Sequence, residues 1–211
     1  MVLRGGGEYL PLHAQVLARQ VEKYLCTDVV CFSDVPVPGV EVIPLRLAWP
    51  TWWAKMELFN PREQGDFLYL DLDTAVLGDL SDIASVNRLT ILRDFYRDGT
   101  RRPEGLGSGM MYLPESDRAE IWEKWHQAPA KFISHYRMAG KGDQAFLEDW
   151  SMTRWARWQD LVPGQVMSWK VHNLSAGLPK NLRVICFHGR PRPWRTERFA
   201  HLYGVTDRWR A

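Results

Sequence analysis

Apolar and polar positions follow two different periods along this chain, which predicts a protein that mixes strands and helices. Short runs of β-branched and aromatic residues bounded by Gly, Pro, Asn or Asp predict strands, and apolar residues three or four positions apart predict helices. The predicted strands cover residues 2–3, 28–33, 40–45, 67–71, 90–93, 109–113, 165–169 and 182–188. The predicted helices cover residues 11–25, 52–59, 116–127 and 143–155.

The order of these elements predicts an α/β fold. Strand, helix and strand follow one another at the start of the chain, as in a right-handed β-α-β unit. We expect a single domain over residues 1–195 with a mainly parallel central sheet flanked by helices, and a basic tail over residues 196–211. Residues 93–107 are polar and contain glycine, which predicts a loop.

Composition agrees with one folded domain. The chain has 211 residues, of which 45% are hydrophobic and 25% are charged, so it can bury a core without disulfides or metal ions. Its three cysteines, Cys26, Cys31 and Cys186, lack C-x-x-C spacing and predict buried thiols in a reducing compartment. Neither a signal peptide nor a run of about 18 apolar residues is visible. We therefore expect a cytoplasmic protein, and attachment to a membrane surface stays open.

Positive charge gathers towards the end of the chain. The formal net charge is only +2, which argues against a surface dedicated to nucleic acid, yet residues 190–211 hold six arginines against Glu197 and Asp207. Such a segment suits the phosphates of a ligand, an anionic membrane or a nucleic acid, and it suits plain solvation equally well.

Two acids at the end of a predicted strand carry the most informative chemistry. Asp71 and Asp73 follow apolar residues 67–70 and, being two residues apart, point to the same side of an extended backbone. There they can hold one divalent cation or one polyphosphate, at the strand end where α/β proteins bind ligands. The pattern alone leaves three interpretations: acids that only cap a turn, a metal site, and a haloacid dehalogenase-like phosphatase with Asp71 as nucleophile. The phosphatase pattern expects Thr or Val where Ala75 stands, so it ranks second.

Five segments recur together in the order and spacing of a known family. They are residues 52–59 (WWAKMELF), 69–74 (YLDLDT), 107–111 (GSGMM), 142–144 (GDQ) and 187–194 (FHGRPRPW). Together they resemble family 8 of the retaining glycosyltransferases, the glycogenin-like and galactosyltransferase-like enzymes with the GT-A (Rossmann-like) fold, over about residues 2–195. The resemblance implies a metal-dependent enzyme that moves a sugar from a nucleoside diphosphate, with UDP expected, to an acceptor hydroxyl with retention of configuration.

The resemblance also implies a metal site. Asp71 and Asp73 are expected to hold Mn²⁺ or Mg²⁺, with Asp71 shared with hydroxyls of the donor. The family's histidine ligand aligns with Cys186, a departure from the pattern. His188 lies two residues later and would share a face with that position on a strand, so we expect His188 as the third ligand.

Further positions of the donor site follow from the same resemblance. Arg192, which stands where the family has lysine, and Lys55 are expected at the diphosphate. The remaining donor-binding residues are expected to be Tyr9 at the nucleobase, together with Ser108 and Gly189. Gly107 replaces an asparagine that contacts the donor sugar in the family, which leaves the sugar undetermined.

Asp143 and Gln144 match the pair that lies near the reacting carbon in the family. They are the expected catalytic residues, although Asp143 is equally suited to begin a helix. The resemblance implies that the leaving diphosphate itself deprotonates the acceptor on the same face.

Partners beyond the nucleotide sugar are less defined. Family analogy implies a glycan, a glycolipid or a protein hydroxyl as the acceptor. Arginines 93, 97, 101 and 102 and the basic tail, interleaved with aromatic residues 194, 199, 203 and 209, also leave room for a hydroxylated base in DNA. A protein that binds nucleotide sugar without transferring it is a third alternative, and the oligomeric state is open.

Overall fold

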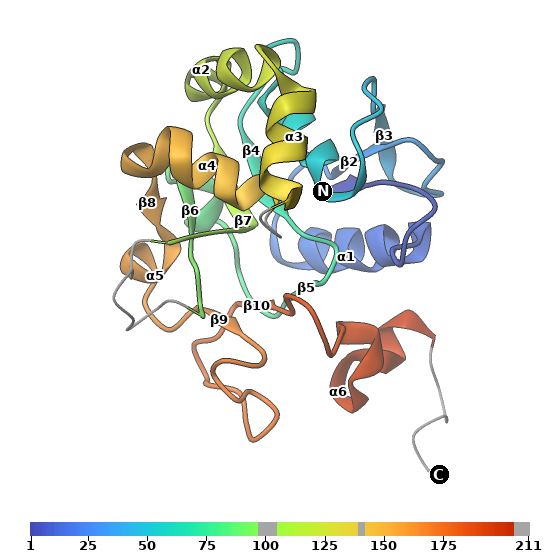
Figure 1. Ribbon diagram of the computed structural model, residues 1–211. Coiled ribbons are helices and arrows are strands. Elements are labelled where there is room, and N and C mark those ends of the chain that lie inside the picture. Colours follow the sequence, from blue (N-terminus) through green and yellow to red (C-terminus); the bar gives the residue numbers. More distant parts are fainter. Residues whose placement is uncertain (97–104, 139–141, 205–211) are drawn as a thin grey trace.

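The computed structural model describes residues 1–96, 105–138 and 142–204 (Figure 1). Its strands are β1 (Val2–Leu3), β2 (Val30–Ser33), β3 (Glu41–Pro44), β4 (Phe67–Leu70), β5 (Thr74–Val76), β6 (Thr90–Arg93), β7 (Leu106–Leu113), β8 (Ala156–Arg157), β9 (Val166–Ser168) and β10 (Val184–Cys186). Its α-helices are α1 (Pro11–Tyr24), α2 (Glu115–His126), α3 (Pro129–Met138), α4 (Asp143–Ser151), α5 (Trp158–Leu161) and α6 (Glu197–Ala200). Short 3-10 helices are η1 (Thr51–Phe59), η2 (Ile83–Ser85), η3 (Met152–Arg154), η4 (Pro193–Arg195) and η5 (His201–Tyr203).

The strands form three sheets. The first, β1-β2-β3, is parallel throughout, as the β-α-β start of the chain predicts. The second, β4-β7-β6-β8, pairs β7 antiparallel with both β4 and β6. The third, β5-β10-β9, pairs β10 antiparallel with β5 and parallel with β9. The α/β class is confirmed, and the expected parallel arrangement is complete only in the first sheet, since β7 pairs antiparallel with β4 and β6, and β10 pairs antiparallel with β5.

Helices cover the sheets in two groups. Leu17 and Val21 of α1 pack in one apolar cluster with Leu3 of β1 and Val184 of β10. In a second cluster, Trp125 of α2 and Phe146 of α4 pack against η1 and β7. Figure 1 shows α2, α3 and α4 grouped together, away from α1.

Several predicted elements differ from those in the structure. Residues 51–59 form a 3-10 helix, and the helix predicted to reach residue 155 ends at Ser151. Helix α3 was not predicted, although Phe132 and Tyr136 stand one helical turn apart after Pro129. The loop predicted over residues 93–107 is too long at both ends, because β7 already begins at Leu106, which pairs with Arg93 of β6. Arginines 97, 101 and 102 lie outside the described residues.

The first part of the predicted basic tail packs against the domain. Phe199 is buried edge to face against the rings of Trp169 and Phe187, with centroids 5.8 and 5.5 Å away, and Tyr203 is buried beside Trp194. These aromatic side chains are therefore unavailable for stacking on a nucleic acid, and Trp209 lies outside the described residues.

Two of the cysteines are buried as expected, and one is not. Cys31 and Cys186 lie in the core, whereas Cys26 is exposed after the end of α1. Among the described residues, no helix combines the length and apolar character that crossing a bilayer requires.

Candidate functional site

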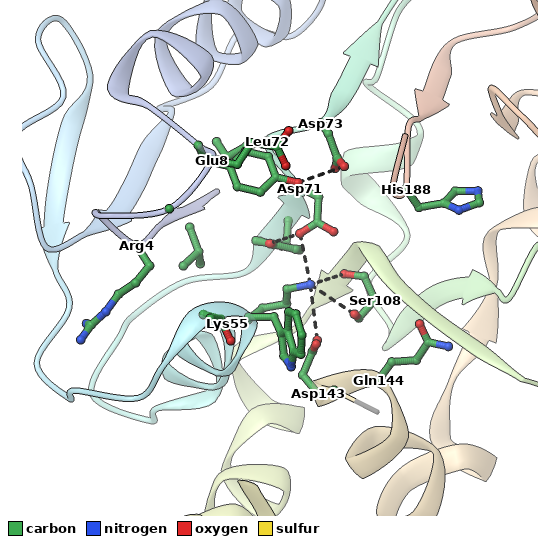
Figure 2. A pocket seen from close by; sticks show the side chains of 18 of the residues that line it. Arg4, Glu8, Lys55, Asp71, Leu72, Asp73, Ser108, Asp143, Gln144 and His188 are labelled. Carbon is green, nitrogen blue, oxygen red and sulfur yellow. Dashed lines mark hydrogen bonds and ion pairs between the residues drawn. The ribbon is translucent and has the colours of Figure 1, made fainter. Parts of the chain in front are cut away.

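All ten predicted site residues line a single cavity of about 750 Å³ (Figure 2). Its walls come from the loop at residues 4–9 after β1, from η1, from the start of α4 and from residues 188–192 after β10. This volume lies within the range of about 300–1,000 Å³ that is typical of small-molecule sites. The two acids after β4 form its floor.

Asp71 and Asp73 both face this cavity. Strand β4 ends at Leu70, and the hydroxyl of its residue Tyr69 donates a hydrogen bond to Asp71 Oδ1. Asp73 is only 5% exposed. Burial, and then the negative charge of Asp71, raise the pKa of Asp73 to about 6. The two carboxylates are thus close enough to repel each other, which favours the binding of a cation between them.

Lys55 contacts three other residues that line the cavity. Its ammonium is 3.1 Å from Asp71 Oδ1 and 3.4 Å from Asp143 Oδ2, and it donates hydrogen bonds to Ser108 O (3.3 Å) and Ser108 Oγ (3.2 Å). Burial alone would lower the pKa of Lys55, but Asp143 and Asp71 outweigh it and leave the pKa raised. Lys55 is therefore a charged, buried link between β4, β7 and α4.

Arg192 reaches the acids from the opposite end of the chain. Its Nη1 is paired with Asp73 Oδ2, and its Nη2 lies 3.0 Å from Glu8 Oε2. Tyr9 donates from its hydroxyl to the same Asp73 oxygen at 3.0 Å, and the Arg192 guanidinium lies 5.0 Å from the centre of the Tyr9 ring. The phosphate-binding cation expected from the sequence thus lies directly beside the acid pair.

Asp143 and Gln144 begin α4 at the other wall. Asp143 is buried, and its Oδ2 accepts no hydrogen bond from the described residues although Lys55 is near. Gln144 Nε2 donates to Asp94 Oδ2 at 3.3 Å. A buried oxygen without a donor is costly unless a ligand supplies one. Asp143 therefore presents an acceptor that suits a sugar hydroxyl.

His188 lines the same cavity with its ring turned aside. Its Nε2 lies 2.6 Å from Ser168 Oγ, and its ring stacks on Phe95 with centroids 5.6 Å apart. Burial, and then the charge of Lys170, lower the pKa of His188 to about 4. Figure 2 shows the ring pointing away from Asp71 and Asp73. Ligation of a metal by His188 stays a prediction, and it requires the ring to leave Ser168.

The donor set fits a divalent cation held by two carboxylates. Among the described residues, no group of three or more His, Cys, Asp or Glu side chains converges on one point. Mg²⁺ is commonly bound by one or two carboxylates with substrate phosphates completing its coordination. Asp71 and Asp73 beside Arg192 match that chemistry, and without a histidine turned towards them the geometry gives no preference for Mn²⁺ over Mg²⁺.

Among the residues that the sequence did not predict, two hold predicted site residues in position. Glu8 fixes Arg192, and Asp94 fixes Gln144. Asp94 directly follows β6, so it carries the same signal of an acid at a strand end that identified Asp71. Glu8 carried no such signal, because its role depends on contact with Arg192, which is 184 positions away.

Comparison with solved structures identifies the fold. A galactosyltransferase, LgtC, in complex with donor and acceptor sugar analogues matches with a TM-score of 0.69 and 13% identity, over 99% of this chain and 97% of that one. The glycosyltransferase GlyE of Streptococcus pneumoniae TIGR4 matches with a TM-score of 0.66 and 15% identity, over 97% of this chain and 60% of that one. The bifunctional glycosyltransferase WbbM matches with a TM-score of 0.60 and 12% identity, over 96% of this chain and 48% of that one.

No protein-family model matches the sequence, and neither does any curated protein. At identities this low, structural similarity establishes the architecture and not the activity. The resemblance seen in the five sequence segments is confirmed at that level: the chain has the GT-A fold of glycosyltransferases.

Proposed function

We propose that the protein is a metal-dependent glycosyltransferase, which moves a sugar from a nucleoside diphosphate, with UDP preferred, to an acceptor hydroxyl with retention of configuration. The observation that carries the proposal is the cluster of Asp71, Asp73 and Arg192 on the floor of a cavity in a GT-A fold. Paired carboxylates beside a guanidinium suit a diphosphate and its cation.

The diphosphate end of the donor is assigned to Arg192. Its guanidinium is held by Glu8 and Asp73, so it is oriented before any ligand arrives. Asp71 and Asp73 would hold the divalent cation, which offsets negative charge on the departing diphosphate. Tyr9, which lies under Arg192, is assigned to the nucleoside side of the donor.

The transferred sugar is assigned to the wall formed by Lys55, Ser108 and Asp143. Asp143 Oδ2 is ion-paired with Lys55 at 3.4 Å but accepts no hydrogen bond from the described part of the chain, so it offers an acceptor, and Ser108 and Lys55 complete a polar surface for hydroxyl groups. During transfer the bond between the sugar's anomeric carbon and the phosphate oxygen breaks, and a bond to the acceptor oxygen forms. The acceptor's proton passes to the diphosphate oxygen on the same face. Gln144, held by Asp94, stabilises charge near that carbon.

A glycan, glycolipid or protein hydroxyl is the preferred acceptor. The burial of Phe199 and Tyr203 removes part of the argument for a DNA base. The GT-A fold argues against the phosphatase alternative, because the haloacid dehalogenase-like pattern belongs to a different fold.

Mass spectrometry of the protein incubated with Mg²⁺ or Mn²⁺ and a panel of nucleotide sugars tests the proposal. We expect one donor to be hydrolysed slowly to UDP and free sugar, and Asp73→Asn to lower that rate by about 100-fold or more. Asp28→Asn, which removes an exposed acid outside the cavity, is the control. Full activity of Asp73→Asn without added metal would contradict the proposal. Tight UDP binding without hydrolysis or transfer would instead identify a binding protein.

A further inference from the structure

Two adjacent tryptophans in η1 have opposite environments. Trp53 is 2% exposed and stacks on Trp125 with ring centroids 5.1 Å apart, so it belongs to the core. Trp52 is 53% exposed and lines the cavity. Exposing a tryptophan forgoes a large gain from burial, so its place at the edge of a binding cavity calls for an explanation.

The backbone before Trp52 is held in an unusual conformation. Thr51 has a φ of 53°, in the left-handed region that a β-branched residue rarely adopts, and it also lines the cavity. Such backbone strain is concentrated at functional sites. The distorted turn at Thr51 fixes where the indole of Trp52 leaves the backbone.

The indole of Trp52 packs closely against the backbone of Gly142. A Cβ atom on Gly142 would lie 2.6 Å from Trp52 Nε1 and 2.9 Å from its Cδ1, so only glycine lets the indole approach this closely. The next residue is Asp143, whose Oδ2 accepts no hydrogen bond from the residues that the structure describes and is assigned to a sugar hydroxyl. An exposed aromatic ring is thereby placed next to the hydroxyl-binding wall.

We propose that Trp52 is the platform of an acceptor subsite, on which the apolar face of a pyranose ring stacks. This inference rests on the proposed sugar transfer and deepens it, because it names the acceptor as a pyranoside. A pyranose presents C–H groups on its faces and hydroxyls around its edge, which suits an indole beside carboxylates. We assign the nucleoside to Tyr9 and not to Trp52, because Tyr9 contacts both Asp73 and Arg192, the residues assigned to the cation and the diphosphate. The exposure of Trp52 favours the acceptor, which enters from solvent, over the donor sugar.

Saturation-transfer NMR tests the subsite without any turnover. The probes are methyl β-D-glucopyranoside and methyl β-D-galactopyranoside, with acyclic sorbitol as the counter-probe, added to the protein saturated with UDP and Mg²⁺. We expect signals on the ring C–H protons of a pyranoside and none on sorbitol. Trp52→Ala should weaken pyranoside binding about tenfold or more, as truncation of an aromatic anchor does. Trp150→Phe, at another exposed tryptophan outside the cavity, should leave it unchanged.

A second pair of variants tests whether Gly142 acts through Trp52. Gly142→Ala should weaken pyranoside binding because the new methyl displaces the indole, and it should add little when Trp52 is already alanine. Additive losses would show that Gly142→Ala acts on Asp143 instead.

Three outcomes would overturn the inference. They are the absence of any pyranoside signal on the wild-type protein, unchanged binding by Trp52→Ala, and a loss of UDP affinity by Trp52→Ala as large as the loss for the pyranoside. The last would place Trp52 against the nucleotide. Donor hydrolysis by the wild-type protein is measured separately, so failure of the subsite is distinguishable from failure of the proposed function.

Discussion

Replacing Lys55 with methionine tests the ionic link at the base of the cavity. Methionine keeps most of the side-chain volume and removes the charge. Lys55 is 6% exposed and has carboxylate oxygens at 3.1 and 3.4 Å. At an effective dielectric constant of about 20, each of these attractions amounts to roughly 5 kcal/mol before desolvation is subtracted.

The net effect is smaller than that sum but still large. Desolvation of the ammonium offsets several kcal/mol, and breaking a buried pair by removing one partner typically costs about 3–5 kcal/mol. For a chain of this size the loss corresponds to a decrease in Tm of roughly 6–20 °C. We expect Lys55→Met to show that decrease, since it leaves Asp143 buried and without a counter-charge.

Urea and thermal unfolding followed by circular dichroism measure the effect. Lys180→Met, at an exposed lysine, is the control and should change stability by less than about 0.5 kcal/mol. Adding Asp143→Asn to Lys55→Met should recover part of the loss, because the orphaned charge is removed. If Lys55→Met lowered the free energy of unfolding by less than about 1 kcal/mol, this reasoning would be refuted. Lys55 would then be better explained as a ligand of the donor's phosphates.

Three further predictions concern the scaffold. Arg118→Met should lower stability by about 2 kcal/mol or more in urea unfolding, because Arg118 is fully buried and donates to the carbonyls of residues 58, 63 and 65; a change below about 0.5 kcal/mol would contradict this. Burial, opposed by the charge of Glu8 and reinforced by that of Arg192, lowers the pKa of His13 to about 4, so the unfolded chain binds the proton at a higher pH than the folded protein does. The free energy of unfolding should therefore fall as pH drops from 6.5 to 4, by roughly 1–3 kcal/mol more in the wild-type protein than in His13→Gln. Equal dependence of the free energy of unfolding on pH in the two proteins would show that His13 is not responsible. A thiol reagent should label Cys26 rapidly in the folded protein and reach the other two cysteines only on unfolding. Counting the labelled thiols with and without urea tests this, and Cys26→Ser, which should show no rapid labelling, is the control.

Local patterns identified most of the fold because each is set by neighbouring residues. The apolar stripe of α1 and the run before Asp71 predicted their elements to within a few residues. Strand direction is not a local property. Whether β7 runs parallel or antiparallel to β4 depends on the path of the chain between them, and the sequence pattern does not encode it.

The site was predictable where residue type alone defines the chemistry. The acids, Lys55 and Arg192 all reach one cavity. Their partners were not predictable, because a contact such as Lys55 with Asp143 depends on how α4 meets η1. The orientation of His188 depends in the same way on Ser168, which lies on a neighbouring strand.

The contact between Glu8 and Arg192 also has a consequence for how the protein is made. These residues are 184 positions apart, and β10, which precedes Arg192, pairs with β5 and β9. During synthesis the first half of the chain emerges early and contains both Asp71 and its partner Lys55, but Asp73 gains its cationic partner only after residue 192 has left the ribosome. Contacts of such long range form slowly. The nascent chain therefore carries an incomplete anionic pocket for most of its synthesis, and a chain that stops before residue 192 lacks the guanidinium that we assign to the diphosphate.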